Sequence, residues 1–264
     1  MLAKRIMSIA LFVPLVLVTT YLGGLWFFLF VLLVALVAGR EYYQLLDRGG
    51  YQPQHLAGLA FIALFILAQR FPNQRIAEGT LAGGAMALLT WQVFRGNAPG
   101  SLASWGLTLA GAIYLGWLPG HFVALRELTD GLWWVLLAFA ITWVCDSAAY
   151  IVGHVWGKRR FFPRISPRKT LEGAIGGLAF GLITPLAFTS ILPLSWAHAL
   201  LLGLVGSVAS TFGDLGESVI KRQIGVKDSS TLIPGHGGMM DRIDSLLFNV
   251  VIVYYYAYWI LGTR

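Results

Sequence analysis

Residues 214–244 read DLGESVIKRQIGVKDSSTLIPGHGGMMDRID and form the most polar stretch of this length in a strongly apolar chain. Five acidic and four basic side chains fall within it, together with the run Pro-Gly-His-Gly-Gly at 234–238. Apolar residues flank the stretch on both sides. Because charged side chains beside lipid are costly, we expect this stretch to be kept for its chemistry.

The composition is that of a membrane protein. Of 264 residues, 57% are hydrophobic and 12% are charged, and the mean hydropathy is +0.72. A soluble domain is about one half apolar and about one quarter charged. The net charge of +7 indicates cytoplasmic loops and contact with anionic lipids, not nucleic acid. We therefore expect an all-α, polytopic integral membrane protein.

Apolar runs of roughly 20 residues predict about nine transmembrane helices in one membrane domain, residues 1–264. About five of the spans precede residue 130, and residues 131–264 hold the catalytic helices with the stretch 214–244. With a cytoplasmic N-terminus, 15 of the 19 Lys and Arg residues lie inside and 4 outside. This bias places residues 158–169 and 214–244 on the cytoplasmic side. Residues 40–51 are interpreted as a polar break whose Tyr42, Tyr43, Leu45 and Leu46 lie at the membrane interface.

Asp214 is expected on a helix that continues from the apolar run before it. Ser218 and Lys221 or Arg222 then share its face, at spacings of four, seven or eight residues. One interpretation is an ion pair between Asp214 and Lys or Arg that joins two helices. The other is a metal ligand, because Asp214 and Asp241 come from separate segments and carboxylates suit a hard cation such as Mg²⁺.

The glycine turn at 234–238 could bind phosphate through its backbone N–H groups, with basic side chains around it. His236 could act as a general acid or base, donate a hydrogen bond to phosphate, or simply stabilise the turn. Asp244 could instead cap the last helix. A second group, Asp146 and Lys169, is expected to form the opposite wall, with the helix face of Asp146 and Tyr150 pointing into the bundle.

Ser218-x-Ile-Lys-Arg222, Lys227-Asp-x-Ser230 and Ile233-Pro-x-His-Gly-Gly-Met-x-Asp-Arg-Ile-Asp244 together resemble the signature of the phosphatidate cytidylyltransferases, the CDP-diacylglycerol synthases. The strings CDSAAY and SPRKTLEGAIGG look like other segments of that family. The resemblance implies the reaction of CTP with phosphatidate to give CDP-diacylglycerol and diphosphate, with Mg²⁺ and a monovalent cation such as K⁺. It also implies a bacterial-type inner membrane enzyme of phospholipid biosynthesis, with its active site facing the cytoplasm.

Site residues follow from the resemblance and from the chemistry above. Asp214 and Asp241 are the expected metal ligands. The glycine-rich spans favour close helix packing and a homodimer. The expected catalytic residues are Asp214, Asp241, Lys221, Arg222 and Asp244, and the expected substrate- and phosphate-binding residues are Ser218, Lys227, Asp228, His236, Gly237, Gly238, Arg242, Lys169 and Asp146.

Two other functions fit some of these residues. A CTP-dependent lipid-alcohol kinase would need a base for a neutral hydroxyl, for which His236 or Asp228 would serve. An ion-coupled transporter would use Asp146 and Asp214 as coupling sites. The sequence shows no internal repeat, which disfavours the transporter.

Overall fold

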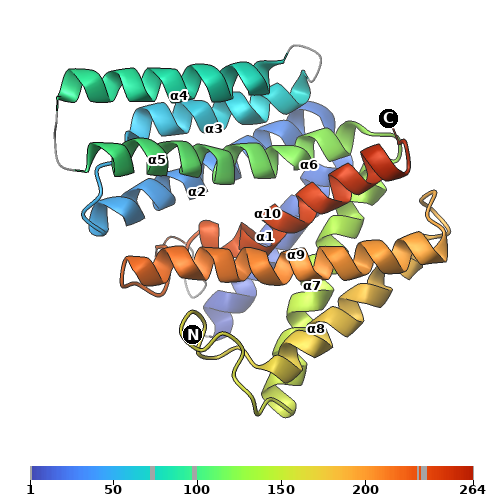
Figure 1. The fold of residues 1–264 in the computed structure, drawn as a ribbon. Coiled ribbons are helices and arrows are strands. Elements are labelled where there is room, and N and C mark those ends of the chain that lie inside the picture. The colour runs from blue at the N-terminus through green and yellow to red at the C-terminus, as the bar shows by residue number, and fades with distance from the viewer. Residues whose placement is uncertain (1, 72–74, 97–99, 231, 233–236, 264) are drawn as a thin grey trace. The chain divides into compact units, whose positions relative to one another are not determined.

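The computed structural model describes residues 2–71, 75–96, 100–230, 232 and 237–263. Within these ranges all regular elements are helical, and Arg160 and Thr170 form an isolated β-bridge. The expected all-α fold is confirmed. The α-helices are α1 (Leu2–Leu22), α2 (Gly24–Arg48), α3 (His55–Arg70), α4 (Ile76–Arg95), α5 (Ser101–Ala112), α6 (Leu118–Glu127), α7 (Gly131–Val155), α8 (Leu171–Ile183), α9 (Trp196–Gln223) and α10 (Met240–Tyr255) (Figure 1).

Three short elements extend these helices. A π-helical turn, η2 (Ile113–Trp117), joins α5 to α6, and a second one, η4 (Tyr256–Ile260), follows α10. A 3₁₀ turn, η3 (Thr184–Phe188), follows α8 and has a proline in its first turn.

Six helical segments of the described chain are long and apolar enough to cross a membrane. The protein is therefore a multi-pass membrane protein. The expected count of nine spans is not confirmed. The six segments are Gly24–Arg48, Ser101–Glu127, Gly131–Val155, Leu171–Phe188, Trp196–Gln223 and Met240–Ile260.

The chain divides into two compact units. The first unit comprises Met1–Ala124 and Gln223–Arg242, and the second comprises Leu125–Arg222 and Ile243–Arg264. The division near residue 124 lies close to the one expected near 130. However, the middle of the polar stretch, residues 223–242, belongs to the first unit and not to the C-terminal helices.

In the first unit, α2, α3, α4 and α5 lie side by side (Figure 1). The Tyr43 hydroxyl donates to the carbonyl oxygen of Thr108 at 2.9 Å, and that of Tyr42 donates to Leu107 at 3.3 Å. The interpretation of residues 40–51 as a polar break is wrong, because α2 continues to Arg48 and Tyr42, Tyr43, Leu45 and Leu46 are all buried. Their position at the membrane interface stays a prediction.

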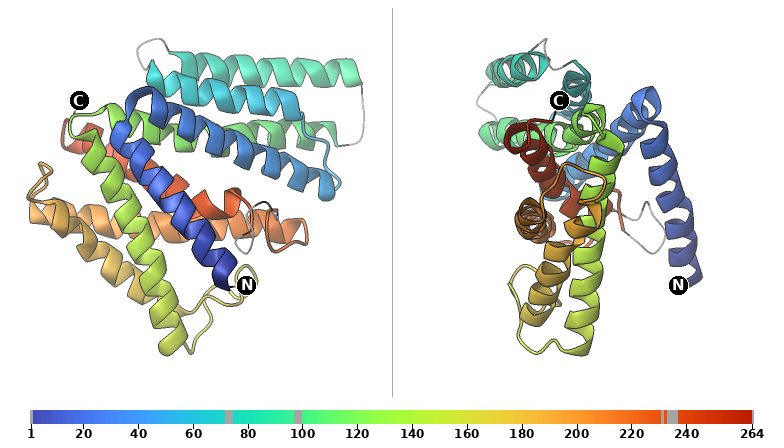
Figure 2. Two further views of the ribbon diagram at one scale, coloured as in Figure 1. Left: turned by 180° about the vertical axis from the view of Figure 1, so that it is seen from behind. Right: turned by 90° about the vertical axis from the view of Figure 1, so that its right-hand side faces the viewer.

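In the second unit, α7 and α8 lie side by side, as the right-hand view of Figure 2 shows. A row of glycines lines their contact. Gly173, Gly177 and Gly181 lie four residues apart on the buried face of α8. A Cβ atom on Gly177 would lie 2.8 Å from the carbonyl oxygen of Cys145. The row therefore follows the small-xxx-small pattern of membrane helices. These glycines serve packing within one chain, so they do not by themselves require a dimer.

Polar side chains also join α7, α9 and α10 inside the second unit. Thr142 and Ser210 share a hydrogen bond of 2.9 Å, and the Asn249 amide donates to Thr142 at 2.9 Å and to the Ala138 carbonyl at 2.8 Å. All three side chains are buried. Hydrogen bonds between membrane helices stabilise them by on the order of 1 kcal/mol.

Candidate active site

Asp214 lies on α9, which continues unbroken to Gln223 as the sequence predicted. Its carboxylate pairs with Lys169, whose Nζ lies 2.6 Å from Oδ2. Ser218, one turn further along α9, donates to the other oxygen at 3.4 Å. The structure thus brings Lys169, from the loop before α8, to Asp214. The ion pair expected for Asp214 exists, but its partner Lys169 lies in a loop and not on a second helix.

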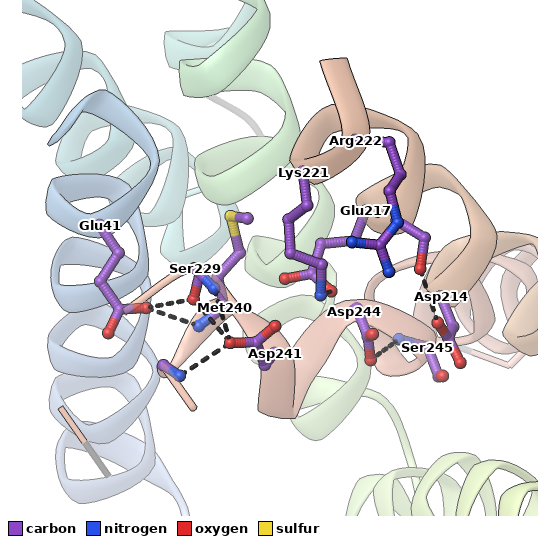
Figure 3. Close-up of polar contacts among 12 residues, drawn as sticks. Glu41, Asp214, Glu217, Lys221, Arg222, Ser229, Met240, Asp241, Asp244 and Ser245 are labelled. Atoms are coloured by element: carbon purple, nitrogen blue, oxygen red, sulfur yellow. Dashed lines mark hydrogen bonds and ion pairs between the residues drawn. The ribbon is translucent and has the colours of Figure 1, made fainter. Parts of the chain in front are cut away.

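A second ion pair lies one turn further along the same helix. Lys221 Nζ is 2.6 Å from Glu217 Oε2, and the two side chains are 10% and 0% exposed (Figure 3). Lys221 was an expected catalytic residue, and the structure gives it a buried partner on its own helix. Its neighbour Arg222 is exposed and donates through Nε to the carbonyl oxygen of Ile165 at 3.1 Å.

Two further carboxylates complete this group. Asp244 on α10 interacts electrostatically with Asp214 and lies near Glu217 (Figure 3). Asp146 on α7 interacts with Asp214, Asp244 and Lys169. We call this set the carboxylate cluster. It consists of Asp146, Lys169, Asp214, Glu217, Lys221 and Asp244, all within the second unit.

The structure differs from the sequence-based expectations for Asp244, Tyr150 and Asp146. Asp244 does not cap α10, because the helix begins four residues earlier and Asp244 accepts the N–H of its neighbour Ser245 at 2.6 Å. The face of Tyr150 was expected to point into the bundle, and this is wrong because Tyr150 is 74% exposed. Asp146 lies on the surface of the chain as well.

The carboxylate cluster contains two more carboxylates than ammonium groups. Among the described residues no three His, Cys, Asp or Glu side chains converge as a ready-made metal cage. Mg²⁺ does not need one, because it commonly uses one or two carboxylates and completes its shell with waters and substrate phosphates. An excess of oxygen ligands at a negatively charged site fits that cation.

Asp241 belongs to the first unit, at the start of α10. Its Oδ2 accepts the backbone N–H groups of Gly238 at 2.8 Å and Ser229 at 3.0 Å, and the Ser229 hydroxyl at 2.8 Å. Asp241 therefore organises the residues around it. Its joint role with Asp214 as a metal ligand stays a prediction.

The rest of the expected phosphate-binding residues are placed as follows. Gly237 has a φ of +78°, which favours glycine, and a Cβ there would lie 2.6 Å from Asp241 Oδ2. Lys227, Asp228 and Arg242 are exposed. His236 lies outside the described residues. Exposure leaves the two bases accessible to an anionic ligand.

Two acidic residues, Glu217 and Glu41, were not among the site residues expected from the sequence. Glu217 lies four residues before Lys221, and this spacing on a helix is itself a signal for an ion pair. Glu41 lies on α2 within the segment interpreted as a polar break, and it is only 4% exposed. Nothing in its local sequence indicates its partners, which are almost 200 residues away.

Comparison with known proteins identifies the family. The chain matches the cytidylyltransferase family over residues 3–260. The chain belongs to this family. It is 38% identical to the phosphatidate cytidylyltransferase of Bacillus subtilis (strain 168) over 207 residues, which cover 76% of this chain and 77% of that protein.

Two further relatives carry the same name and cover more of the chain. The protein from Staphylococcus haemolyticus (strain JCSC1435) is 36% identical over 92% of both chains. The one from Synechocystis sp. (strain ATCC 27184 / PCC 6803 / Kazusa) is 31% identical over 98% of this chain and 97% of its own. The resemblance found in the sequence is confirmed, and with it the enzyme class of a nucleotidyltransferase.

Proposed function

We propose that this protein is a phosphatidate cytidylyltransferase, which converts CTP and phosphatidate to CDP-diacylglycerol and diphosphate. The names of its relatives support the substrates. The observation that carries the proposal is the carboxylate cluster, in which acidic and basic side chains from α7, α9, α10 and the loop before α8 gather in a membrane-spanning unit. Ionisable side chains within membrane segments are costly, so they are usually retained for function. The cluster therefore favours a catalytic role.

The reaction needs little from a general base. A phosphate oxygen of phosphatidate is already an anion, and it forms a bond to the α-phosphorus of CTP while the bond from that phosphorus to the bridging oxygen of diphosphate breaks. The difficulty is to bring two anions together and hold them in line. Catalysis therefore depends on neutralising charge and on alignment.

The basic side chains of this chain are suited to that work. Lys169 is partly exposed and pairs with Asp214. Its ammonium group can therefore move from the Asp214 carboxylate to a phosphate oxygen without leaving the cluster. Arg222, Lys227 and Arg242 are exposed and offer further donors to the triphosphate. Lys221 is held in place by Glu217, which fixes the position of its charge.

Mg²⁺ would supply additional positive charge to the triphosphate and so favour departure of diphosphate. Asp214 would hold it, with Asp146 and Asp244 nearby in the same unit and Asp241 as the second ligand expected from the family pattern. A monovalent cation such as K⁺ is a further expectation of the resemblance.

We place the enzyme in a bacterial-type inner membrane with its active site facing the cytoplasm. The excess of Lys and Arg in the expected cytoplasmic loops supports this orientation. The test is a single new cysteine at Arg164 in a Cys145→Ser background. A membrane-impermeant maleimide should label it in inside-out vesicles and not in right-side-out vesicles, and the reverse pattern would exclude the proposed orientation.

Purified protein in detergent with phosphatidate should release diphosphate from CTP when Mg²⁺ is present and form CDP-diacylglycerol. Replacing phosphatidate by a long-chain lipid alcohol should abolish the reaction. Release of CDP in place of diphosphate, with phosphorylation of the alcohol, would show a lipid-alcohol kinase instead. The absence of both products from folded, metal-loaded protein would contradict the proposal.

A further inference from the structure

Glu41 is a buried carboxylate whose hydrogen bonds all come from a distant part of the chain. Its Oε1 accepts the Ser230 hydroxyl at 2.6 Å and the Met239 N–H at 3.0 Å. Its Oε2 accepts the Met240 N–H at 2.9 Å and the Ser229 hydroxyl at 3.4 Å (Figure 3). All five residues belong to the first unit, so one carboxylate on α2 holds both sides of the loop that precedes α10.

Two of these donors are the backbone N–H groups at the start of α10. The first N–H groups of a helix have no partner within the helix, and the helix dipole makes that end favourable for a negative charge. Glu41 provides that charge from another helix. Hydrogen bonds to an ionised acceptor are about twice as strong as neutral ones, so this contact fixes the residue at which α10 begins.

The contact extends to Asp241 through Ser229, which is 1% exposed. The Ser229 hydroxyl lies within hydrogen-bonding distance of both carboxylates, and its N–H donates to Asp241 as well. Gly238 donates its N–H to Asp241, and a Cβ on it would collide with Ser229 and Glu41. The network leaves no room for another side chain at 238, and it determines where the Asp241 carboxylate lies.

A buried carboxylate is an expensive way to secure a helix end, because removing a charge from water costs several kcal/mol unless hydrogen bonds replace the water. The Ser230 hydroxyl and the N–H groups of Met239 and Met240 make that replacement, with the Ser229 hydroxyl 3.4 Å away. An apolar side chain at 41 would avoid the cost but would leave two helix N–H groups without an acceptor. The arrangement favours a defined geometry over stability alone.

We propose that Glu41 is a positioning residue for the nucleotidyl transfer reaction, acting through Ser229 and the start of α10 to orient Asp241 and the Gly237–Gly238 backbone. This inference rests on the proposed function. In this role Glu41 acts through its neighbours and does not itself contact CTP or phosphatidate. It determines how residues of the polar stretch present their donors and carboxylate to CTP.

Glu41→Gln tests the inference, because the amide keeps the size of the side chain and replaces one acceptor oxygen with a donor. Amide hydrogen exchange at Gly238, Met239 and Met240 should become about tenfold faster, equivalent to about 1.4 kcal/mol, while amides in α3 and α5 stay unchanged. The kcat for CTP should fall at least tenfold. Glu41→Asp, which keeps the carboxylate, should recover part of both effects.

Asp47→Asn is the matched control, since Asp47 also lies on α2, is exposed and pairs with His55 at 2.8 Å. It should leave exchange at 238–240 and the kcat unchanged. Unchanged exchange at these amides in Glu41→Gln, or faster exchange throughout the first unit, would overturn the positioning role. So would a normal kcat with faster local exchange. If the wild-type protein itself lacks cytidylyltransferase activity, the proposed function fails. The exchange results still test, independently, whether Glu41 holds residues 238–240 in place.

Discussion

Lys221 of the signature forms a buried ion pair with Glu217. Variants of this pair can separate the structural role of Lys221 from its catalytic role. Lys221→Met removes the ammonium group and keeps an unbranched side chain of similar length. It leaves the carboxylate of Glu217, which is fully buried, without the cation 2.6 Å away. Glu217→Gln removes the opposite charge and leaves the ammonium group, which is only 10% exposed.

Loss of one partner from a buried ion pair costs about 3–5 kcal/mol, because the remaining charge stays buried. That shifts the unfolding equilibrium by a factor of roughly 10² to 4 × 10³. Removing both partners is often close to neutral. The double variant Glu217→Gln/Lys221→Met should therefore be more stable than either single variant, although it carries more changes.

The measurements are titration with sodium dodecyl sulfate, followed by tryptophan fluorescence, and diphosphate release from CTP. We expect the double variant to regain stability but not activity, because the positive charge of Lys221 is still missing from the site. Lys227→Met, at an exposed base of the same stretch, should leave stability unchanged. Equal stability of Lys221→Met and wild type would refute the buried-pair argument. Full activity in the double variant would remove Lys221 from the catalytic residues.

Two other predictions use the same assays. Asp214→Asn and Asp241→Asn should each nearly abolish turnover while the protein stays folded, and wild-type turnover by both at limiting Mg²⁺ would refute the metal assignment. Gly177→Val should destabilise the second unit by about 1–3 kcal/mol, because its Cβ would meet the Cys145 carbonyl at 2.8 Å. Gly83→Ala, where a Cβ meets nothing within 4 Å, is the control, and an equal loss of stability in both variants would contradict the packing argument.

Local patterns were enough to predict much of the fold. The continuous apolar runs indicated membrane helices, and the spacing of Asp214, Ser218 and Lys221 indicated that α9 extends past its apolar part. The start of α10 was less well predicted. Asp244 was a candidate cap of this helix, which would place the first helical residue at Ser245, whereas the helix begins at Met240.

Long-range contacts could not be predicted in this way. The pairing of Lys169 with Asp214 joins a loop to a helix 45 residues later in the chain, and any of several bases could have been the partner. Glu41 is 199 residues from Met240, and an acid after a long apolar run is usually a sign that the helix has reached water. Only the packing of α2, which buries Tyr42 and Tyr43, shows that this helix face points inward.

Residues 223–242 belong to the first unit, and this affects what a truncated chain would retain. The signature lies in the C-terminal half, which invites the view that the first 124 residues serve as a dispensable membrane anchor. Those residues and the middle of the signature form one compact unit, and they supply the acceptor that secures the start of α10. A fragment that begins after residue 124 would keep every residue of the signature yet lack the scaffold for its central portion.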